Sequence, residues 1–284
     1  MHLVSRPFLL LGWGLTGLLA WSANVQAASG TVEVDLVLPQ NDTYAPAPII
    51  PVAFAIQRSD LAAYLQPSLT FSILPYNNWS HSLANGHYAM TWANFTSSDP
   101  YMQYGEALEV LNTEGVWMLI WQLDFAHCSA GTGVLNITGD HKLGRVVFTT
   151  KNGAKKPDLT AATTASSGED TSSCPNDQAF AFNITETRDS GDFFENRQPC
   201  AVLAETTPAP SPCAVTIDTA AASSVSSSLT HLACRLQTGE PAPWCPEPEK
   251  DAAAGGVVVP RMAAVGGVAC LAAAVGGLGF LAVV

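Results

Sequence analysis

The most regular feature of the sequence is an alternation of apolar and polar residues over short segments. From Val32 to Leu38 every second residue is aliphatic, and Glu33 and Asp35 stand between them. A period of two predicts a strand with one buried face. The same period recurs over residues 50–56, 69–73, 90–92, 135–137, 146–148 and 180–184. Prolines at positions 46, 48 and 51 place the second of these segments after a loop or at a sheet edge.

Residues 116–125 show a different pattern, because they are apolar at both parities. This predicts a central strand buried on both faces. Trp117 and Trp121 share one face of that strand with Leu119 and Leu123, which indicates a core layer rather than a ligand platform. Many short strands separated by Gly, Pro, Asn and Ser predict an all-β fold, a β-sandwich. The sandwich is immunoglobulin-like at most, since no tryptophan lies between the first two cysteines of the mature chain.

The sequence predicts one or two short helices. Ser59 is the expected N-cap of a helix over residues 60–65, and Asp218 that of a helix over residues 219–233. In the second helix the apolar positions recur at a spacing of three to four, which predicts one buried face. They are Ala222, Val225, Leu229 and Leu232.

The first 27 residues have the three zones of a cleavable signal peptide. Arg6 precedes an apolar run over residues 8–20, and Val25 and Ala27 are small residues at the expected places before a cleavage site. The run is too short for the ~20 residues that a membrane-spanning helix requires. We therefore expect a secreted chain that begins after Ala27 or Ala28.

The last residues predict a second processing signal. Residues 262–284 are uncharged and follow a cluster of small residues, the layout of a glycosylphosphatidylinositol (GPI) signal whose tail, here residues 257–284, is removed. The attachment candidates are Asp251, Ala252, Ala253, Ala254 and Gly255. The alternative is a retained single-pass helix, which normally has Lys or Arg on its cytoplasmic side. We favour the lipid anchor, which places the protein at the outer face of the plasma membrane or in the cell wall.

The cysteine count fits an oxidising compartment. One of the seven cysteines, Cys270, lies in the tail. The remaining six predict a disulfide-stabilised domain with three bridges, whose pairing the spacing leaves open. They are Cys128, Cys174, Cys200, Cys213, Cys234 and Cys245.

Five Asn-x-Ser/Thr sequons predict N-glycosylation. The acceptors are Asn41, Asn78, Asn94, Asn136 and Asn183. Asn136 and Asn183 stand opposite the apolar parity of their segments, so we expect both to face solvent.

Composition limits the partners. The chain holds 12 basic and 24 acidic residues, a formal net charge of −12, and no basic patch that would bind nucleic acid. Residues 28–245 have the length of one β-rich domain. Residues 246–256 continue a segment rich in Pro, Ala and Gly that would link this domain to the anchor.

No catalytic constellation stands out. Asp124, His127 and Ser129 contain the residue types of a nucleophile triad, but along a strand Asp124 and His127 point to opposite faces. The histidines lack the i, i+4 and HxH spacings of metal sites. We therefore expect no enzyme activity, no cofactor and no metal.

Exposed aromatic residues provide an alternative function. We expect four of them at the surface, where they could stack on sugar rings of wall glucan or chitin: Tyr76, Trp79, Tyr101 and Tyr104. The leading hypothesis is a non-enzymatic, GPI-anchored surface glycoprotein, structural or adhesive, in contact with cell-wall polysaccharide or wall proteins. A carbohydrate-binding module is the alternative.

Several blocks resemble a family of secreted proteins from filamentous ascomycete fungi that carry a domain of unknown function. They are residues 32–46, residues 50–57, the run from Glu114 through Trp117 to Cys128 and Ser129, and the Ala/Ser-rich stretch between Cys213 and Cys234. The resemblance covers roughly residues 31–245. It implies a fungal source and a secreted, often anchored, protein, and it carries over no reaction and no catalytic residue.

Overall fold

The computed structural model describes residues 28–131, 133–160, 178–211, 215, 217–236 and 242–246. The predicted signal peptide, the attachment candidates, the apolar tail, Cys174 and Cys213 lie outside these residues. Among the helices in the described part of the chain, none is long and apolar enough to cross a membrane.

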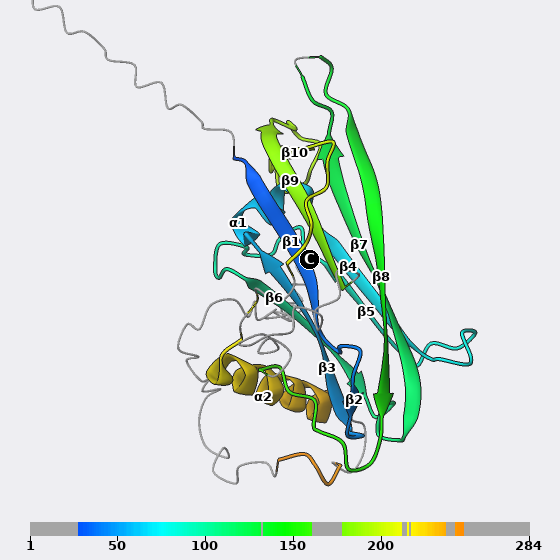
Figure 1. The fold of residues 1–284 in the computed structure, drawn as a ribbon. Coiled ribbons are helices and arrows are strands. Elements are labelled where there is room, and N and C mark those ends of the chain that lie inside the picture. The colour runs from blue at the N-terminus through cyan, green and yellow to red at the C-terminus, as the bar shows by residue number, and fades with distance from the viewer. Residues whose placement is uncertain are drawn as a thin grey trace, which may run out of the picture.

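The described residues form ten strands in two layers (Figure 1). The first layer, in spatial order, holds β5 (Ala84–Ala89), β4 (Ser68–Pro75), β7 (Gly115–Cys128), β8 (Ile137–Thr150) and β2 (Thr43–Tyr44). The second holds β10 (Cys200–Leu203), β9 (Ala179–Arg188), β1 (Gly30–Leu38), β3 (Ile49–Gln57) and β6 (Tyr101–Leu108). A parallel pairing of Val202 with Cys128 joins the layers at one end.

Aromatic side chains fill the space between the layers. Phe54 of β3 lies with its ring centroid 5.4 Å from that of Trp121 of β7, and Trp121 is 4.6 Å from Phe180 of β9. Phe125 of β7 and Phe182 of β9 form a second contact of this kind farther along the two strands, with ring centroids 4.6 Å apart. Such tilted rings add to the burial of apolar area that drives folding. The fold is all-β, as the alternating pattern predicts.

The central strand β7 pairs with β4 on one side and β8 on the other. Its residues Leu119, Trp121 and Leu123 are buried, which confirms the predicted core layer. The Trp121 indole lies against Gly144 of β8, where a Cβ atom would stand 2.2 Å from Trp121 Nε1. Only glycine leaves room for the ring at this position.

The prolines predicted the surroundings of β3 correctly, because this strand begins directly after the loop of residues 45–48. Among the described residues, 49–52 of β3, Pro51 included, pair with β6 alone, and residues 53–56 pair with both β1 and β6. The prediction that one face of β1 is solvent-exposed was wrong. The strand β1 is buried on both faces, and Glu33 and Asp35 are only 7% and 1% exposed. The segment after β10 covers this outer face: the Ala204 N–H donates to the Asn183 carbonyl of β9, and the Ser211 N–H donates to Glu33.

The fourth predicted strand was also misplaced. The strand β5 ends at Ala89, and Trp92 lies in a turn beyond it with 71% of its surface exposed.

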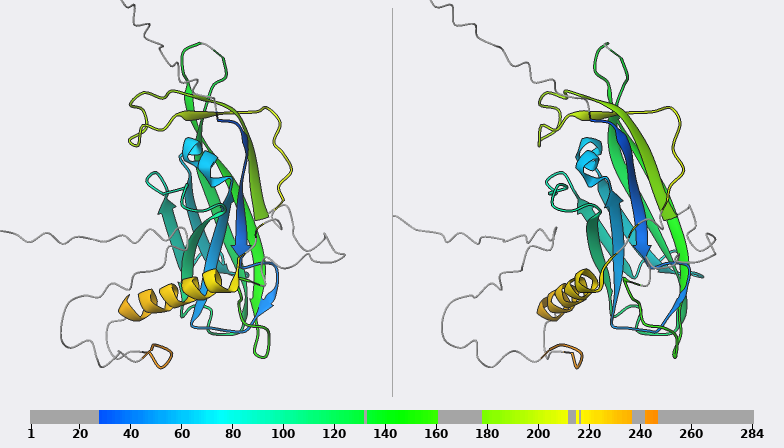
Figure 2. Two further views of the ribbon diagram at one scale, coloured as in Figure 1. Left: turned by 90° about the vertical axis from the view of Figure 1, so that its left-hand side faces the viewer. Right: turned by 60° about the vertical axis from the view of Figure 1, so that its left-hand side comes forward.

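Three helical elements occur in the described residues: α1 (Ser59–Ala62), the 3-10 turn η1 (Ala63–Leu65) and α2 (Thr219–Leu236). Ser59 was wrongly expected to be an N-cap. Its hydroxyl instead donates to the carbonyls of Phe95 and Ser98, because the residue is buried against that loop. Figure 2 shows α1 and α2 near opposite ends of the sandwich.

The helix α2 begins as predicted. Asp218 Oδ1 accepts the N–H of Ala221 at 2.7 Å, the N-cap interaction. The buried face contains Ala222, Val225, Leu229 and Ala233. Leu232 is 44% exposed, so its predicted place on that face was wrong.

Two disulfides lie within the described residues. Cys128–Cys200 joins β7 to β10 where the two layers meet, and Cys234–Cys245 ties the end of α2 to the following segment. Val202, Ile137 and Phe194 pack around the first bridge in a small second core.

Candidate functional site

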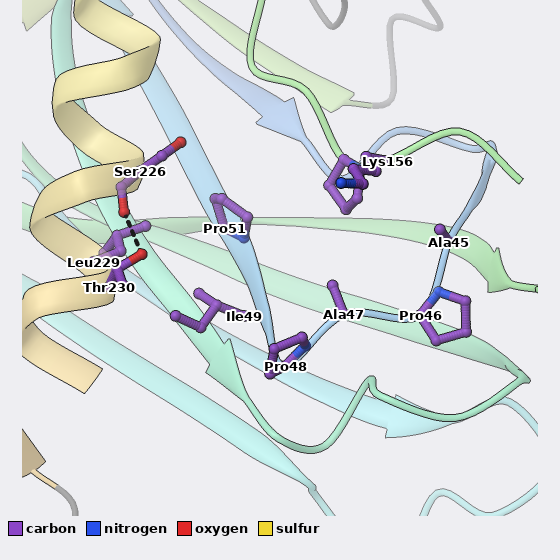
Figure 3. A pocket seen from close by; sticks show the side chains of 11 residues that line it. Ala45, Pro46, Ala47, Pro48, Ile49, Pro51, Lys156, Ser226, Leu229 and Thr230 are labelled. Carbon is purple, nitrogen blue, oxygen red and sulfur yellow. Dashed lines mark hydrogen bonds between the residues drawn. The ribbon is translucent and has the colours of Figure 1, made fainter. Parts of the chain in front are cut away.

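A groove with a volume of about 340 Å³ lies between α2 and the segment that leads into β3 (Figure 3). One wall is formed by the alternating alanines and prolines of residues 45–48 together with Ile49 and Pro51. The other wall is formed by Ser226, Leu229 and Thr230 of α2. Lys156 and Pro157 close one end.

Neighbouring contacts hold the proline-rich wall in place. Lys155 forms an ion pair with Asp42, and its carbonyl accepts the N–H of Ala45. The Tyr44 hydroxyl accepts the N–H of Gln40 at 2.9 Å, and its ring is buried beneath the Lys155 ammonium. Burial raises the pKa of Tyr44 to about 12. This wall is therefore rigid, and the prolines leave few backbone N–H groups to meet a ligand.

The chemistry of the groove is that of a contact surface. None of its lining residues carries a carboxylate, an imidazole or a thiol. The Thr230 hydroxyl already donates to the Ser226 carbonyl at 2.8 Å, as the dashed line in Figure 3 shows. Lys156 is exposed at the rim. The groove thus offers apolar area and one cation, and it lacks a general acid–base pair.

The structure separates the four aromatic residues of the predicted sugar platform. Tyr76 and Trp79 are 51% and 65% exposed in the loop between β4 and β5, where the Trp79 indole N–H donates to the Tyr76 carbonyl at 2.7 Å. Tyr101 begins β6 next to α1, at the opposite end of the sandwich. The strand β4 starts near α1 and extends for seven residue steps, about 23 Å, before the chain reaches Tyr76.

Tyr101 and Tyr104 are not exposed as predicted. Tyr101 is 6% exposed and packs edge-on against Phe95 at 5.1 Å. Tyr104 is partly buried against the core, and burial raises its pKa to about 12. Both rings pack against the core, so only Tyr76 and Trp79 of these four residues remain for an external platform.

The sequon asparagines differ in exposure. Asn41, Asn78, Asn94 and Asn136 are exposed, each outside a strand. Asn183 is half-buried in β9. Its predicted solvent-facing position was only partly right, because the segment after β10 crosses β9 at this point.

Sequence reasoning missed two exposed aromatic residues near the α1 end. Trp92 is 71% exposed and Phe193 is 65% exposed. The loops that carry them are joined by a hydrogen bond from Asn196 Nδ2 to the Thr91 carbonyl, 2.7 Å. Trp92 fitted an alternating segment, and its sequence position two residues before Asn94 was the signal that could have marked it.

A buried pair of carboxyl groups is the strongest electrostatic feature. Gln57 Nε2 donates to Asp35 Oδ2 at 2.8 Å, and the Ser211 N–H donates to Glu33 Oε1 at 2.6 Å. No donor among the described residues faces Asp35 Oδ1. Burial, followed by the adjacent Glu33, raises the pKa of Asp35 to about 9, while the Gln57 bond opposes this shift. This shift favours the protonated form of Asp35, which can donate to Glu33.

These two carboxyl groups do not form an open active site. Both are buried beneath the chain that follows β10, and a substrate cannot reach them without displacing that segment. Their effect is on stability, because the hydrogen bond from the Ser211 N–H to Glu33 ties the covering segment to β1.

The Asp124, His127 and Ser129 set does not form a triad. Asp124 and His127 lie three residues apart in the continuous strand β7 and therefore on opposite faces. Asp124 Oδ1 accepts from Gln122, and Ser129 Oγ accepts from the Asn136 N–H. Within the described residues, no group of three His, Cys, Asp or Glu side chains could hold a metal ion.

Comparison with known proteins places the chain by family alone. No curated protein and no solved structure matches it. One family model matches residues 27–245, which include every strand and both helices described above. The chain belongs to this family, whose description is a domain of unknown function (DUF7136).

Proposed function

We propose that the protein is a secreted, N-glycosylated and non-enzymatic component of the fungal cell surface, structural or adhesive, held by a GPI anchor. The observation that carries this proposal is the placement of its sequons. Four acceptor asparagines are exposed outside the strands of a disulfide-stabilised sandwich. Enzymatic transfer of a glycan requires such accessible positions, and disulfides are typical of proteins that pass through an oxidising compartment.

The surface chemistry supports the same proposal. The groove beside α2 offers apolar contact area and no catalytic pair. The buried carboxyls under the segment after β10 act within the fold. An acidic, glycan-covered sandwich remains soluble at high local density, which suits a protein that is anchored in many copies at one surface.

A second candidate function is carbohydrate binding at Tyr76 and Trp79. The exposure of both rings in one loop favours it. The sequon at Asn78 lies between them, so a glycan on this residue would stand beside the same two rings and compete with an external sugar.

Retention on insoluble chitin and β-glucan separates the two functions. The structural or adhesive role predicts that Trp79→Ala leaves the fraction bound to either polymer unchanged from wild type, because this ring makes no required contact. Phe193→Ala, which removes an equally exposed ring elsewhere, is the matched control. Loss of most of the bound fraction with Trp79→Ala, but not with Phe193→Ala, would establish the carbohydrate-binding module instead.

A further inference from the structure

Exposed apolar side chains gather next to the predicted glycosylation sites. Eight large hydrophobic residues are exposed in the described part of the chain. Three of them stand two residues before a sequon asparagine: Tyr76 before Asn78, Trp92 before Asn94, and Val134 before Asn136. A fourth, Trp79, directly follows Asn78. Singly exposed hydrophobic residues are common on protein surfaces, so the informative feature is the position of these residues beside the sequons.

The loop around Asn94 shows how the ring and the acceptor are placed. Trp92, Asn94 and Thr96 are exposed, whereas Ala93 and Phe95 between them pack against the core. The indole of Trp92 and the carboxamide of Asn94 therefore both lie at the surface of the same loop, two residues apart in sequence. The segment from Val134 to Thr138 alternates in the same way around Asn136, with Leu135 and Ile137 turned inward.

Local hydrogen bonds hold the acceptor in this position. Thr96 Oγ1 donates to Asn94 Oδ1 at 2.9 Å, and the Ser97 N–H donates to the Asn94 carbonyl at 3.1 Å. The carboxamide oxygen is thereby fixed, and Nδ2 is the atom to which a sugar would be joined. Asn78 is held similarly, since its Oδ1 accepts the N–H of Ser80 at 3.3 Å.

A sugar joined to Asn94 would find Trp92 within its reach. The first residue of an N-glycan is an N-acetylglucosamine, whose pyranose ring has a face of C–H groups that can pack on an aromatic ring. The covalent link supplies a high effective concentration, so even a weak contact forms without the loss of translational freedom that a separate ligand suffers. The contact removes exposed indole area from water, the ordinary source of hydrophobic stabilisation.

We propose that the N-glycan on Asn94 packs its first N-acetylglucosamine on the indole of Trp92, and that Tyr76 receives the glycan of Asn78 in the same way. This inference rests on the glycosylation put forward under the proposed function. In this arrangement the exposed rings bind the protein's own glycan, which covers them, and they are not free to bind an external sugar.

A double-mutant cycle tests the contact in protein secreted from a glycosylating host. The four forms are wild type, Trp92→Ala, Asn94→Gln and the double variant. Asn94→Gln is expected to lower Tm by about 2–4 °C when Trp92 is present, the shift that a modest contact gives in a domain of this size. In the Trp92→Ala background it is expected to lower Tm by less than half as much, because the ring is already gone.

A control variant and a second measurement test whether the Tm change comes from the contact between ring and glycan or from a general change in loop stability. With Leu143→Ala in place of Trp92→Ala, the two Tm changes are expected to add, since Leu143 is 60% exposed on β8 and has no sequon beside it. Hydroxyl-radical footprinting is expected to show several-fold less oxidation of Trp92 in the glycosylated protein. Enzymatic trimming to a single N-acetylglucosamine should keep that protection, and complete removal of the glycan should abolish it.

The outcomes distinguish this inference from the proposed function. Additive Tm changes and equal oxidation of Trp92 with an occupied Asn94 would overturn the packing contact and leave the glycosylation standing. An unmodified Asn94 in secreted protein would overturn both the contact and the proposed glycosylation at this site.

Discussion

Replacing Asp35 with asparagine is expected to stabilise the protein at neutral and alkaline pH and to change little near pH 4. The folded-state pKa of Asp35, about 9, lies above the ordinary value of 3.8. The proton is therefore held more tightly in the folded state, and the stability that it provides is complete below about pH 4 and lost as the pH rises towards 9. Asparagine is always neutral and keeps a donor for Glu33 and an acceptor for Gln57.

Urea unfolding of wild type and Asp35→Asn at pH 4.5, 6, 7.5 and 9 measures this effect. The difference in unfolding free energy is expected to grow in favour of the variant by up to about 1.4 kcal/mol for each pH unit, the value for one differentially bound proton. Asp192→Asn is the control, because that side chain is 86% exposed. Parallel pH profiles for wild type and Asp35→Asn would show that Asp35 is ionised in the folded protein.

Removing the Cys128–Cys200 bridge is expected to have the second large effect. The bridge spans 72 residues of sequence, and closing a loop of that length lowers the entropy of the unfolded chain by an amount worth about 4 kcal/mol. For a domain of about this size, that corresponds to a decrease in Tm of roughly 8–16 °C. The measurement is differential scanning calorimetry of the Cys128→Ala, Cys200→Ala double variant, secreted under oxidising conditions.

The other described bridge provides an internal comparison. Cys234–Cys245 spans only 11 residues, for which the same relation gives about 3 kcal/mol. It ties the end of α2 to a short segment outside both layers, so part of its effect is local. We expect the Cys234→Ala, Cys245→Ala variant to lower Tm less than the first pair does. A larger decrease in Tm for the Cys234→Ala, Cys245→Ala variant would contradict the expectation that the bridge between the two layers contributes more to stability.

Short-range patterns predicted most of the strands and the N-cap of α2, but they missed β2, β6 and β10. The period of two located β1, β3, β4, β8 and β9, and the continuous apolar run located the central strand β7. Asp218 caps α2 as its side chain and position suggest. These features depend on neighbours within a few residues, so the sequence contains the information directly.

The same patterns could not predict which residues are buried by segments distant in the sequence. The alternation in β1 predicted that Glu33 and Asp35 face water, but Ser211, 178 residues after Glu33, lies over this face. Ser59 fitted a cap, yet a loop 36 residues later takes its hydroxyl. The burial of a polar residue is decided by which distant segment covers it, and periodicity carries no signal for that choice.

The candidate sites also differ in whether they depend on local or on long-range contacts. The exposure of Tyr76 and Trp79 was predicted correctly, whereas Tyr101 packs into the core against Phe95. The groove beside α2 brings together residues 45–51 and 226–230, which no local pattern could have joined.

Peptide-level mass spectrometry of the protein from its own cell surface tests the central proposal most directly. The sample is the material that phosphatidylinositol-specific phospholipase C releases. The proposal predicts a chain that begins at Ala28 or Ser29, carries glycans on the four exposed asparagines, and ends between Asp251 and Gly255 with the remnant of a lipid anchor. Unmodified peptides spanning these asparagines, together with a peptide from residues 263–284 in the mature protein, would contradict it.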